Sequence, residues 1–369
     1  MNPTLVSPVP QPDPLPLPAP PGLLHGLLLL TFFLHLVPMN LLLGGSIITV
    51  FARWRAKTEH ARELVRVAAK WMPVLVAATV TFGVAPLLFV QTLYGRLFFV
   101  SAVLMGWFWF AVIPLVILAY YGTYLLAFRG EKLGSRATLV SVLVALAFVT
   151  VSFLYSNNMS LYLRPDLFVE KYLADARGLQ LNLGEPTLLP RWLHFLTGAI
   201  AVAGMAVSLL GMGTRRARPA FGEWAMRHGA IWFTAATTVG VGAGIWWLAA
   251  LPRPVMLRFM GLGGMATAAF AVGIVAGLAA LLLGAMAIRP PASARLVGSS
   301  AAALLVTLVA MVFMRDQVRT GMLHASFEPT AWAEPQWGVI ALFAVLLVAA
   351  LATVAWMAAA LAKGRSAAS

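Results

Sequence analysis

Nine stretches of this chain are apolar and long enough to cross a lipid bilayer as helices. A spanning helix needs about 20 mostly apolar residues, and such runs recur from Leu23 to Leu361. The chain is 61% hydrophobic and only 10% charged, which is outside the range of soluble globular domains. We therefore expect an all-α polytopic membrane protein. The expected helices are 23–52, 64–95, 97–128, 137–156, 191–212, 228–251, 256–287, 296–314 and 338–361.

Four further segments flank or connect the transmembrane domain, which we place at 23–361. Residues 1–22 contain nine prolines and no basic cluster, so we interpret them as an extended arm and not as a signal peptide. Two long connections, 157–190 and 315–337, either cover a site, dock a partner or simply cap helix ends. Residues 362–369 form a short tail at the other end of the chain.

The distribution of lysine and arginine predicts the orientation of the chain. Counted over alternate connections, 17 of the 26 basic residues fall on one side of the membrane and nine on the other. Cytoplasmic loops carry the excess of positive charge. The N-terminus and both long connections are therefore expected in the periplasm of a bacterial cell. The C-terminus is expected on the cytoplasmic side of the inner membrane.

Three histidines lie in the expected spans, which contain no Asp or Glu to pair with them: His25, His35 and His194. A titratable side chain in hydrocarbon usually has a partner or a function, so we expect a metal, most simply haem iron. The chain has no cysteine, which excludes disulfides, iron–sulfur clusters, Cys-ligated zinc and the covalent attachment of c-type haem. The expected cofactor is a non-covalent haem b held by His or Met.

Met260 is the partner that topology predicts for His194. Each lies three or four residues inside an expected helix that starts at the outer side, about 5–6 Å deep at 1.5 Å per residue. A His and a Met on opposite faces of a haem form a low-spin pair of raised reduction potential. One turn above them, Arg191 and Arg258 could pair with the haem propionates, or could simply snorkel to the interface.

The other histidines are weaker ligand candidates. His35 lies deeper, about 18 Å into the first helix, just before Pro38, which permits a bend. It would allow a second haem, and the sequence leaves this open. His25, on the same helix, has no interpretation. His60, His228 and His324 are expected to be solvated at helix ends or in loops.

The chain resembles subunit I of the cytochrome bd-type quinol oxidases in a set of short motifs spread along its length. Each motif is weak alone, and their order and spacing carry the resemblance. They are His35 before Val37-Pro38; Ala69-Lys70-Trp71, Phe82-Gly83-Val84-Ala85 and Gly95; Arg191-Trp192-Leu193-His194 with Thr197-Gly198-Ala199; and Leu257-Arg258-Phe259-Met260-Gly261-Leu262-Gly263.

The resemblance implies a nine-helix bundle and specific roles. It places His194 and Met260 at the axial ligands of a low-spin b haem, Arg258 at an arginine that steadies this haem, and His35 at a ligand of the oxygen-reducing haem pair. The chain also departs from the family. Gln91 replaces an acid, the family's carboxylate haem ligand and Gly-Arg-Gln-Pro-Trp segment are missing near residue 315, and the quinol-binding loop shrinks to about 252–255.

These departures lead us to expect a membrane b-type cytochrome that transfers electrons without reducing oxygen. Its partners would be the quinone pool, at a site the sequence does not locate, and a periplasmic cytochrome, most simply a multihaem c-type one. Other membrane subunits are also expected, and no nucleic acid. Two alternatives stay open: a divergent bd-type quinol oxidase whose acids come from a second subunit, and a structural anchor without haem. Whether the chain is a quinol-oxidising enzyme subunit also stays open.

Overall fold

The computed structural model describes residues 8–13, 15–54, 58–323 and 333–366, and this part of the chain is almost entirely helical. Nine of its helices are long and apolar enough to cross a membrane. The expectation of an all-α, nine-span membrane protein is therefore confirmed. The nine are α1 (Pro21–Trp54), α2 (Glu59–Leu93), α4 (Gly106–Arg129), α5 (Arg136–Leu161), α7 (Leu188–Thr214), α8 (Pro219–Ala250), α10 (Gly264–Met286), α11 (Ala294–Leu323) and α12 (Trp337–Ser366).

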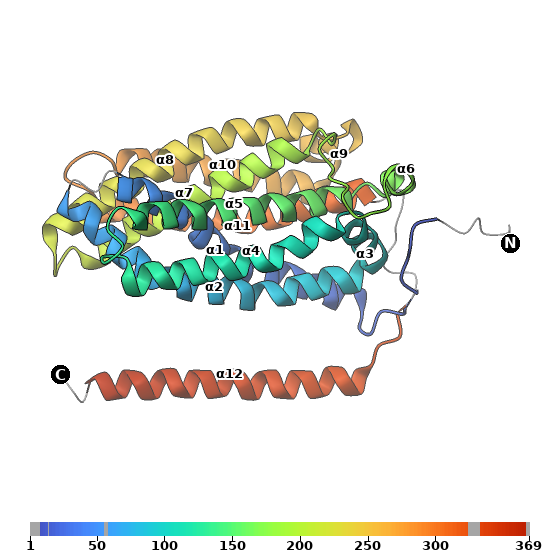
Figure 1. The fold of residues 1–369 in the computed structure, drawn as a ribbon, viewed down its shortest axis with the longest axis horizontal. Coiled ribbons are helices and arrows are strands. Elements are labelled where there is room, and N and C mark those ends of the chain that lie inside the picture. Colours follow the sequence, from blue (N-terminus) through green and yellow to red (C-terminus); the bar gives the residue numbers. More distant parts are fainter. Residues whose placement is uncertain (1–7, 14, 55–57, 324–332, 367–369) are drawn as a thin grey trace.

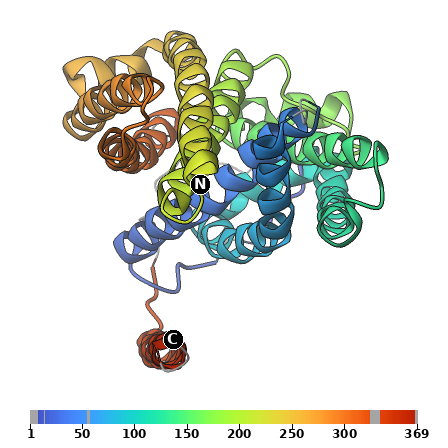
Figure 2. The same ribbon diagram turned by 90° about the vertical axis from the view of Figure 1, so that its left-hand side faces the viewer.

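The first eight of these spans, from α1 to α11, pack together in one bundle, and α12 lies beside it (Figures 1 and 2). Within the bundle α7 packs on α8, α1 packs on both α2 and α7, α4 packs on α5, and α10 packs on α11. Small residues allow the closest of these approaches. A Cβ on Gly44 of α1 would overlap the carbonyl oxygen of Ala199 on α7. The helices that carry His35 and His194 are therefore in direct backbone contact.

Several helices extend beyond the apolar run that predicts them. The α2 helix begins at Glu59, because the Thr58 side chain accepts a hydrogen bond from the Ala61 amide and caps the helix. The α8 helix begins at Pro219, a residue suited to a first helical turn. The α11 helix continues to Leu323, well beyond the expected end at residue 314. Polar residues at these ends continue the helix although they do not continue the apolar pattern.

The expected helix 97–128 is two helices in the structure. It divides at Met105 into α3 (Gly95–Leu104) and α4. The connection between α5 and α7 is bonded to this break, since the Trp107 amide donates to the Gly178 carbonyl at 3.1 Å. Gly178 has φ +78°, and a Cβ there would lie 3.2 Å from the Gly106 nitrogen, so both the turn and the contact require glycine.

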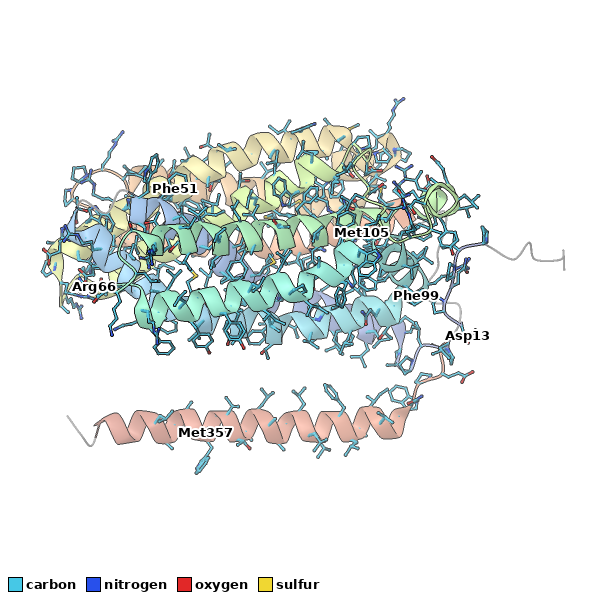
Figure 3. All side chains as sticks on the ribbon, viewed as in Figure 1. Asp13, Phe51, Arg66, Phe99, Met105 and Met357 are labelled. Carbon is cyan, nitrogen blue, oxygen red and sulfur yellow. The ribbon has the colours of Figure 1, made fainter. Side chains whose placement is uncertain are left out.

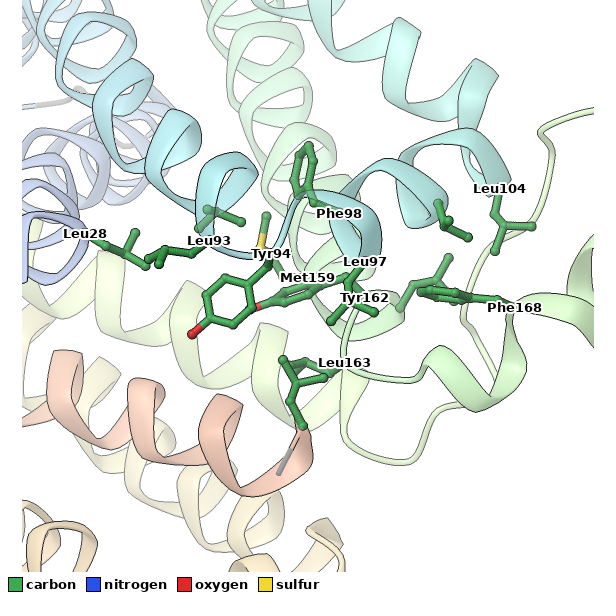
Figure 4. Close-up of a cluster of buried hydrophobic side chains, with 14 of the residues drawn as sticks. Leu28, Leu93, Tyr94, Leu97, Phe98, Leu104, Met159, Tyr162, Leu163 and Phe168 are labelled. Atoms are coloured by element: carbon green, nitrogen blue, oxygen red, sulfur yellow. The ribbon is translucent and has the colours of Figure 1, made fainter. Parts of the chain in front are cut away.

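One end of the bundle, where α1 begins, is called here the N-terminal end. The short helices α3, α6 (Phe168–Ala174) and α9 (Arg253–Leu257) also lie there (Figure 1). Buried apolar side chains of α1, α2, α3 and α5 form a core at this end (Figure 4). The described part of the proline-rich arm joins this core through Val9 and Leu17. The carbonyl of Leu17 also accepts a hydrogen bond from the Glu334 amide, just before α12.

No residue in the apolar span of α12 is buried, and only Ile340 near its start is partly buried against the bundle among its described residues. Its side chains project into open space on all sides, as those around Met357 show in Figure 3. A helix that is apolar around its whole circumference is suited to lipid or to a neighbouring subunit.

Candidate functional site

His194 lies six residues into α7, about 9 Å from its start. Its Nδ1 lies 2.9 Å from the carbonyl oxygen of Gly240 on α8. A carbonyl oxygen only accepts, so Nδ1 carries the proton and Nε2 of the neutral ring keeps its lone pair. Metal-bound histidines commonly have this arrangement, in which one ring nitrogen is fixed by a backbone carbonyl and the other is the ligand.

His35 has the same arrangement on α1. Its Nδ1 lies 3.0 Å from the carbonyl oxygen of Thr79 on α2, so its Nε2 also keeps a lone pair. The motif glycine Gly83 packs against this ring, since a Cβ there would lie 2.9 Å from Cε1. The histidine and the glycine of two separate sequence motifs are therefore neighbours in the fold.

Met260 does not lie on a regular helix. The expected helix 256–287 is interrupted by a π-helical segment, η2 (Arg258–Leu262), in which Met260 and Gly261 have non-helical backbone angles. Gly261 has φ +114°, which a residue with a Cβ rarely adopts. The continuous helix assumed in predicting the depth of Met260 is therefore wrong, and the depth itself stays a prediction. The side chain of Met260 is 48% exposed.

The break is stabilised by side-chain and backbone hydrogen bonds. Thr267 on α10 donates to the Arg258 carbonyl at 2.9 Å and accepts from the Gly261 amide at 3.1 Å. Trp247 of α8 contacts both His194 and the apolar cluster next to this segment. The rings of Trp247 and His194 are 5.9 Å apart, and Trp247 also packs against the core that contains Phe259. Axial pairing of His194 with Met260 stays a prediction.

The two predicted arginines lie in different settings. Arg258 donates from Nη2 to Oε1 of Gln317 at 3.2 Å and so joins η2 to α11. Arg191 is 3% exposed, and its Nε has no hydrogen-bond partner within the described chain. Its guanidinium lies 5.6 Å from the Trp247 ring centroid and 6.0 Å from that of Phe195. Arg191 therefore does not snorkel to water, and ordinary interfacial placement does not explain it.

Two further arginines, which the sequence reasoning did not select, join Arg191 at this end. Arg315 of α11 lies over the rings of Phe32 on α1, at 4.2 Å, and Phe195 on α7, at 5.7 Å. Arg319 of α11 is buried and lies over the ring of Tyr94, at 4.8 Å. An indicator was present in the sequence: two of the nine basic residues of the expected outer side stand four apart, next to Asp316.

His25 is paired with a carboxylate, contrary to the expectation that none was near. Its Nε2 lies 2.8 Å from Oδ1 of Asp316, and Arg319 donates to the same oxygen. Asp316 is 4% exposed, because α11 continues past residue 314 and carries it into the bundle. The pair joins α1 to α11, which gives His25 a structural explanation.

His228 is not a solvated residue at a helix start. It lies within α8, stacks on Trp224 at a centroid distance of 4.5 Å, and its Nε2 accepts from Nε1 of Trp232 at 3.1 Å. His60 is a half-buried neighbour of the same aromatic group, 5.8 Å from the Trp224 ring. His324 lies outside the described residues. Within those that are described, no three His, Asp or Glu side chains are arranged to hold a metal ion.

The connection between α5 and α7 is fastened to the N-terminal end of the bundle. The buried side chain of Asn157 accepts from the Asn182 amide at 3.0 Å. Arg164 bonds to Glu185 and to Asp166, and its hydrogen bonds lower the pKa of the Asp166 carboxyl. These bonds thus hold the connection against the helix ends at the N-terminal end of the bundle, where Arg191, Arg315 and Arg319 also lie.

Comparison with known proteins identifies the fold. The chain superposes on a chain of the bd oxidase from Geobacillus thermodenitrificans with a TM-score of 0.71 and 12% sequence identity, covering 92% of this chain and 98% of the other. No protein-family model matches the chain, and no curated protein matches it either. The molecule is a multi-pass helical membrane protein. Its bundle has the fold of a bd oxidase chain, as the sequence motifs predict.

Proposed function

We propose that the chain is a membrane b-type cytochrome that carries electrons between the quinone pool and a redox protein at its N-terminal end. The observation that carries this proposal is the fixed imidazole of His194, whose Nε2 is left with a lone pair inside a span. Haem iron bound there would supply one-electron redox chemistry.

The residues around His194 fit a haem. The imidazole offers a ligand nitrogen whose tautomer is set by Gly240. Met260 offers a half-exposed thioether on an irregular segment, which is free of the constraints of a helix. Arg191 offers a buried guanidinium whose Nε has no partner in the described chain. These residues would hold and orient the haem, and the aromatic rings of Phe195 and Trp247 would exclude water from the haem site.

Oxygen reduction is not part of the proposal. Such chemistry normally uses intramembrane carboxylates to deliver protons. In the described part of the eight-helix bundle, the carboxylate nearest the arginines is Asp316, and His25 and Arg319 already share its Oδ1. A periplasmic, multihaem c-type cytochrome is the partner we propose, with the N-terminal end as its docking side.

Difference spectra of the purified chain test the proposal. Reduced-minus-oxidised spectra should show a low-spin b haem, and His194→Ala should abolish or strongly shift it. His228→Ala is the matched control, because this half-buried histidine already accepts a hydrogen bond through Nε2. Equal spectra for wild type and His194→Ala would refute the ligand assignment. A wild type without any haem signal would support the anchor alternative.

A divergent quinol oxidase is the second candidate, and the geometry of His35 favours it. Its Nε2 is left free in the same manner as that of His194. Oxygen uptake with a reduced quinol, abolished by His35→Ala, would establish this alternative. Electron transfer to a cytochrome acceptor without oxygen uptake would support the main proposal.

A further inference from the structure

The N-terminal end of the bundle holds more positive charge than its carboxylates neutralise: Arg191 and Arg319 are buried, and Arg315 is half-buried. Arg191, Arg315 and Arg319 come from α7 and α11, and the rings of Phe195 and Tyr94 lie beneath them. Asp316 is bonded by Arg319, and Glu185, further out, is bonded by Arg164. Arg191 and Arg315 are left without a carboxylate among the described residues.

Arg315 is the least satisfied of the three. It makes no hydrogen bond or ion pair within the described part of the chain, and its contacts are the faces of Phe32 and Phe195. Guanidinium groups stack on aromatic faces, but such contacts leave their N–H donors unused. Arg315 is half-buried, and a charge partly removed from water without a partner is unfavourable. The arrangement is therefore suited to bind an anion.

Arg315 also contacts aromatic rings that neighbour the two histidines with free Nε2 atoms. Phe32 precedes His35 by three residues, so the two lie on one face of α1, about one turn apart. Phe195 directly follows His194. An anion that bonds to Arg315 and Arg191 would thus reach toward either imidazole from the N-terminal end of the bundle.

We propose that Arg315, together with Arg191, binds the propionate carboxylates of a haem ligated by His194 or His35. This inference rests on the proposed function. Planar guanidinium groups bind carboxylates through paired hydrogen bonds. The two carboxylates of a haem would match the two unneutralised arginines in number and in charge. Arg315 would then be a cofactor-binding residue, and the aromatic rings would orient its guanidinium.

Arg315→Gln and Arg315→Lys in the full-length purified chain test the inference. The glutamine variant should retain haem about tenfold less well, since a hydrogen bond between charged groups is lost. Its remaining haem should have a lower midpoint potential, because an unneutralised propionate favours ferric iron. The lysine variant should recover part of the haem retention and part of the midpoint potential. In the chain prepared without haem, Arg315→Gln should leave thermal stability unchanged or raise it, whereas a purely structural arginine would lower it.

Arg96→Gln is the matched control, because Arg96 is an exposed arginine at the same end of the bundle. The inference is overturned if Arg315→Gln retains wild-type haem content and potential, or if Arg96→Gln has the same effect. Adding His35→Ala to Arg315→Gln identifies the haem. If the shift in potential persists, the haem is bound by His194, and if it vanishes with the haem signal of His35, the haem is bound there. A wild type without haem would overturn the proposed function and this inference together, before any arginine variant is made.

Discussion

At the scale of single residues, glycines on neighbouring helices set the orientation of both imidazoles. A Cβ on Gly244 would lie 3.0 Å from Nδ1 of His194, and one on Gly83 would lie 2.9 Å from Cε1 of His35. Each ring therefore lies flush against a helix backbone, where its Nδ1 reaches a carbonyl oxygen on that helix. Because Gly244 and Gly83 have no side chain, each imidazole can approach the helix backbone closely and form its hydrogen bond.

Gly244→Ala should displace the His194 imidazole and weaken its bond to Gly240. Overpacking of this kind costs about 1–3 kcal/mol, and we expect lower haem content or a shifted haem spectrum. Gly242→Ala is the control, because it lies on the same helix and its Cβ would meet nothing within 4 Å. Both substitutions raise helix propensity by the same amount, so the difference between their haem spectra reports the contact between Gly244 and His194. A Gly244→Ala spectrum identical to that of Gly242→Ala would contradict the assigned role.

At the scale of elements, α1 and α11 are joined by a charged pair, since Asp316 of α11 bonds to His25 of α1. This pair formed only because α11 continues past the last apolar residue of its run. The apolar pattern marks which residues face lipid or the core, but it ends wherever polar residues begin. Where a helix ends in buried polar residues, the apolar pattern therefore predicts an end several residues before the true one. Asp316 was predicted to lie in a loop for this reason.

Asp316→Asn should destabilise the bundle by about 3–5 kcal/mol, because it leaves Arg319 buried without its carboxylate. Thermal unfolding in detergent measures the loss. The double variant with Arg319→Gln should recover part of it, since the unpaired charge is removed as well. Asp166→Asn, at an exposed pair with Arg164, is the control and should change stability by less than about 1 kcal/mol. Equal effects of Asp316→Asn and Asp166→Asn would show that the buried pair contributes little.

The two helix breaks show what the sequence could not predict. The apolar runs at 97–128 and 256–287 are continuous, so periodicity predicts one helix for each. The break at Met105 depends on backbone hydrogen bonds with Gly178, which accepts from the Trp107 amide, and with Gln180, which donates to the Leu104 carbonyl, both more than 70 residues further along the chain. The break at η2 depends on a glycine with positive φ and on the hydrogen bonds that Thr267 donates to the Arg258 carbonyl and accepts from the Gly261 amide. The motif residues themselves were predictable, but their spatial relation depends on contacts between distant segments.

At the scale of the whole molecule, the N-terminal end concentrates the distinctive chemistry of the chain. The arginines, the break that holds Met260 and the fastened connection between α5 and α7 all lie there. The opposite end has His228 in an aromatic stack and most of the arginines and lysines. If the side with more basic residues faces the cytoplasm, the candidate site faces the periplasm. The orientation thus decides which partner can reach the site.

Cysteine labelling tests the orientation directly, because the natural chain has no cysteine and gives no background. Ala176 is exposed in the connection between α5 and α7, and Ser135 is exposed between α4 and α5 at the other end of the bundle. The excess of basic residues near Ser135 predicts that this end is cytoplasmic. A membrane-impermeant maleimide should therefore label Ala176→Cys in intact spheroplasts, and Ser135→Cys only after the membrane is opened. The reverse pattern would place the arginines and His194 near the cytoplasm, and a periplasmic cytochrome could not then be the partner.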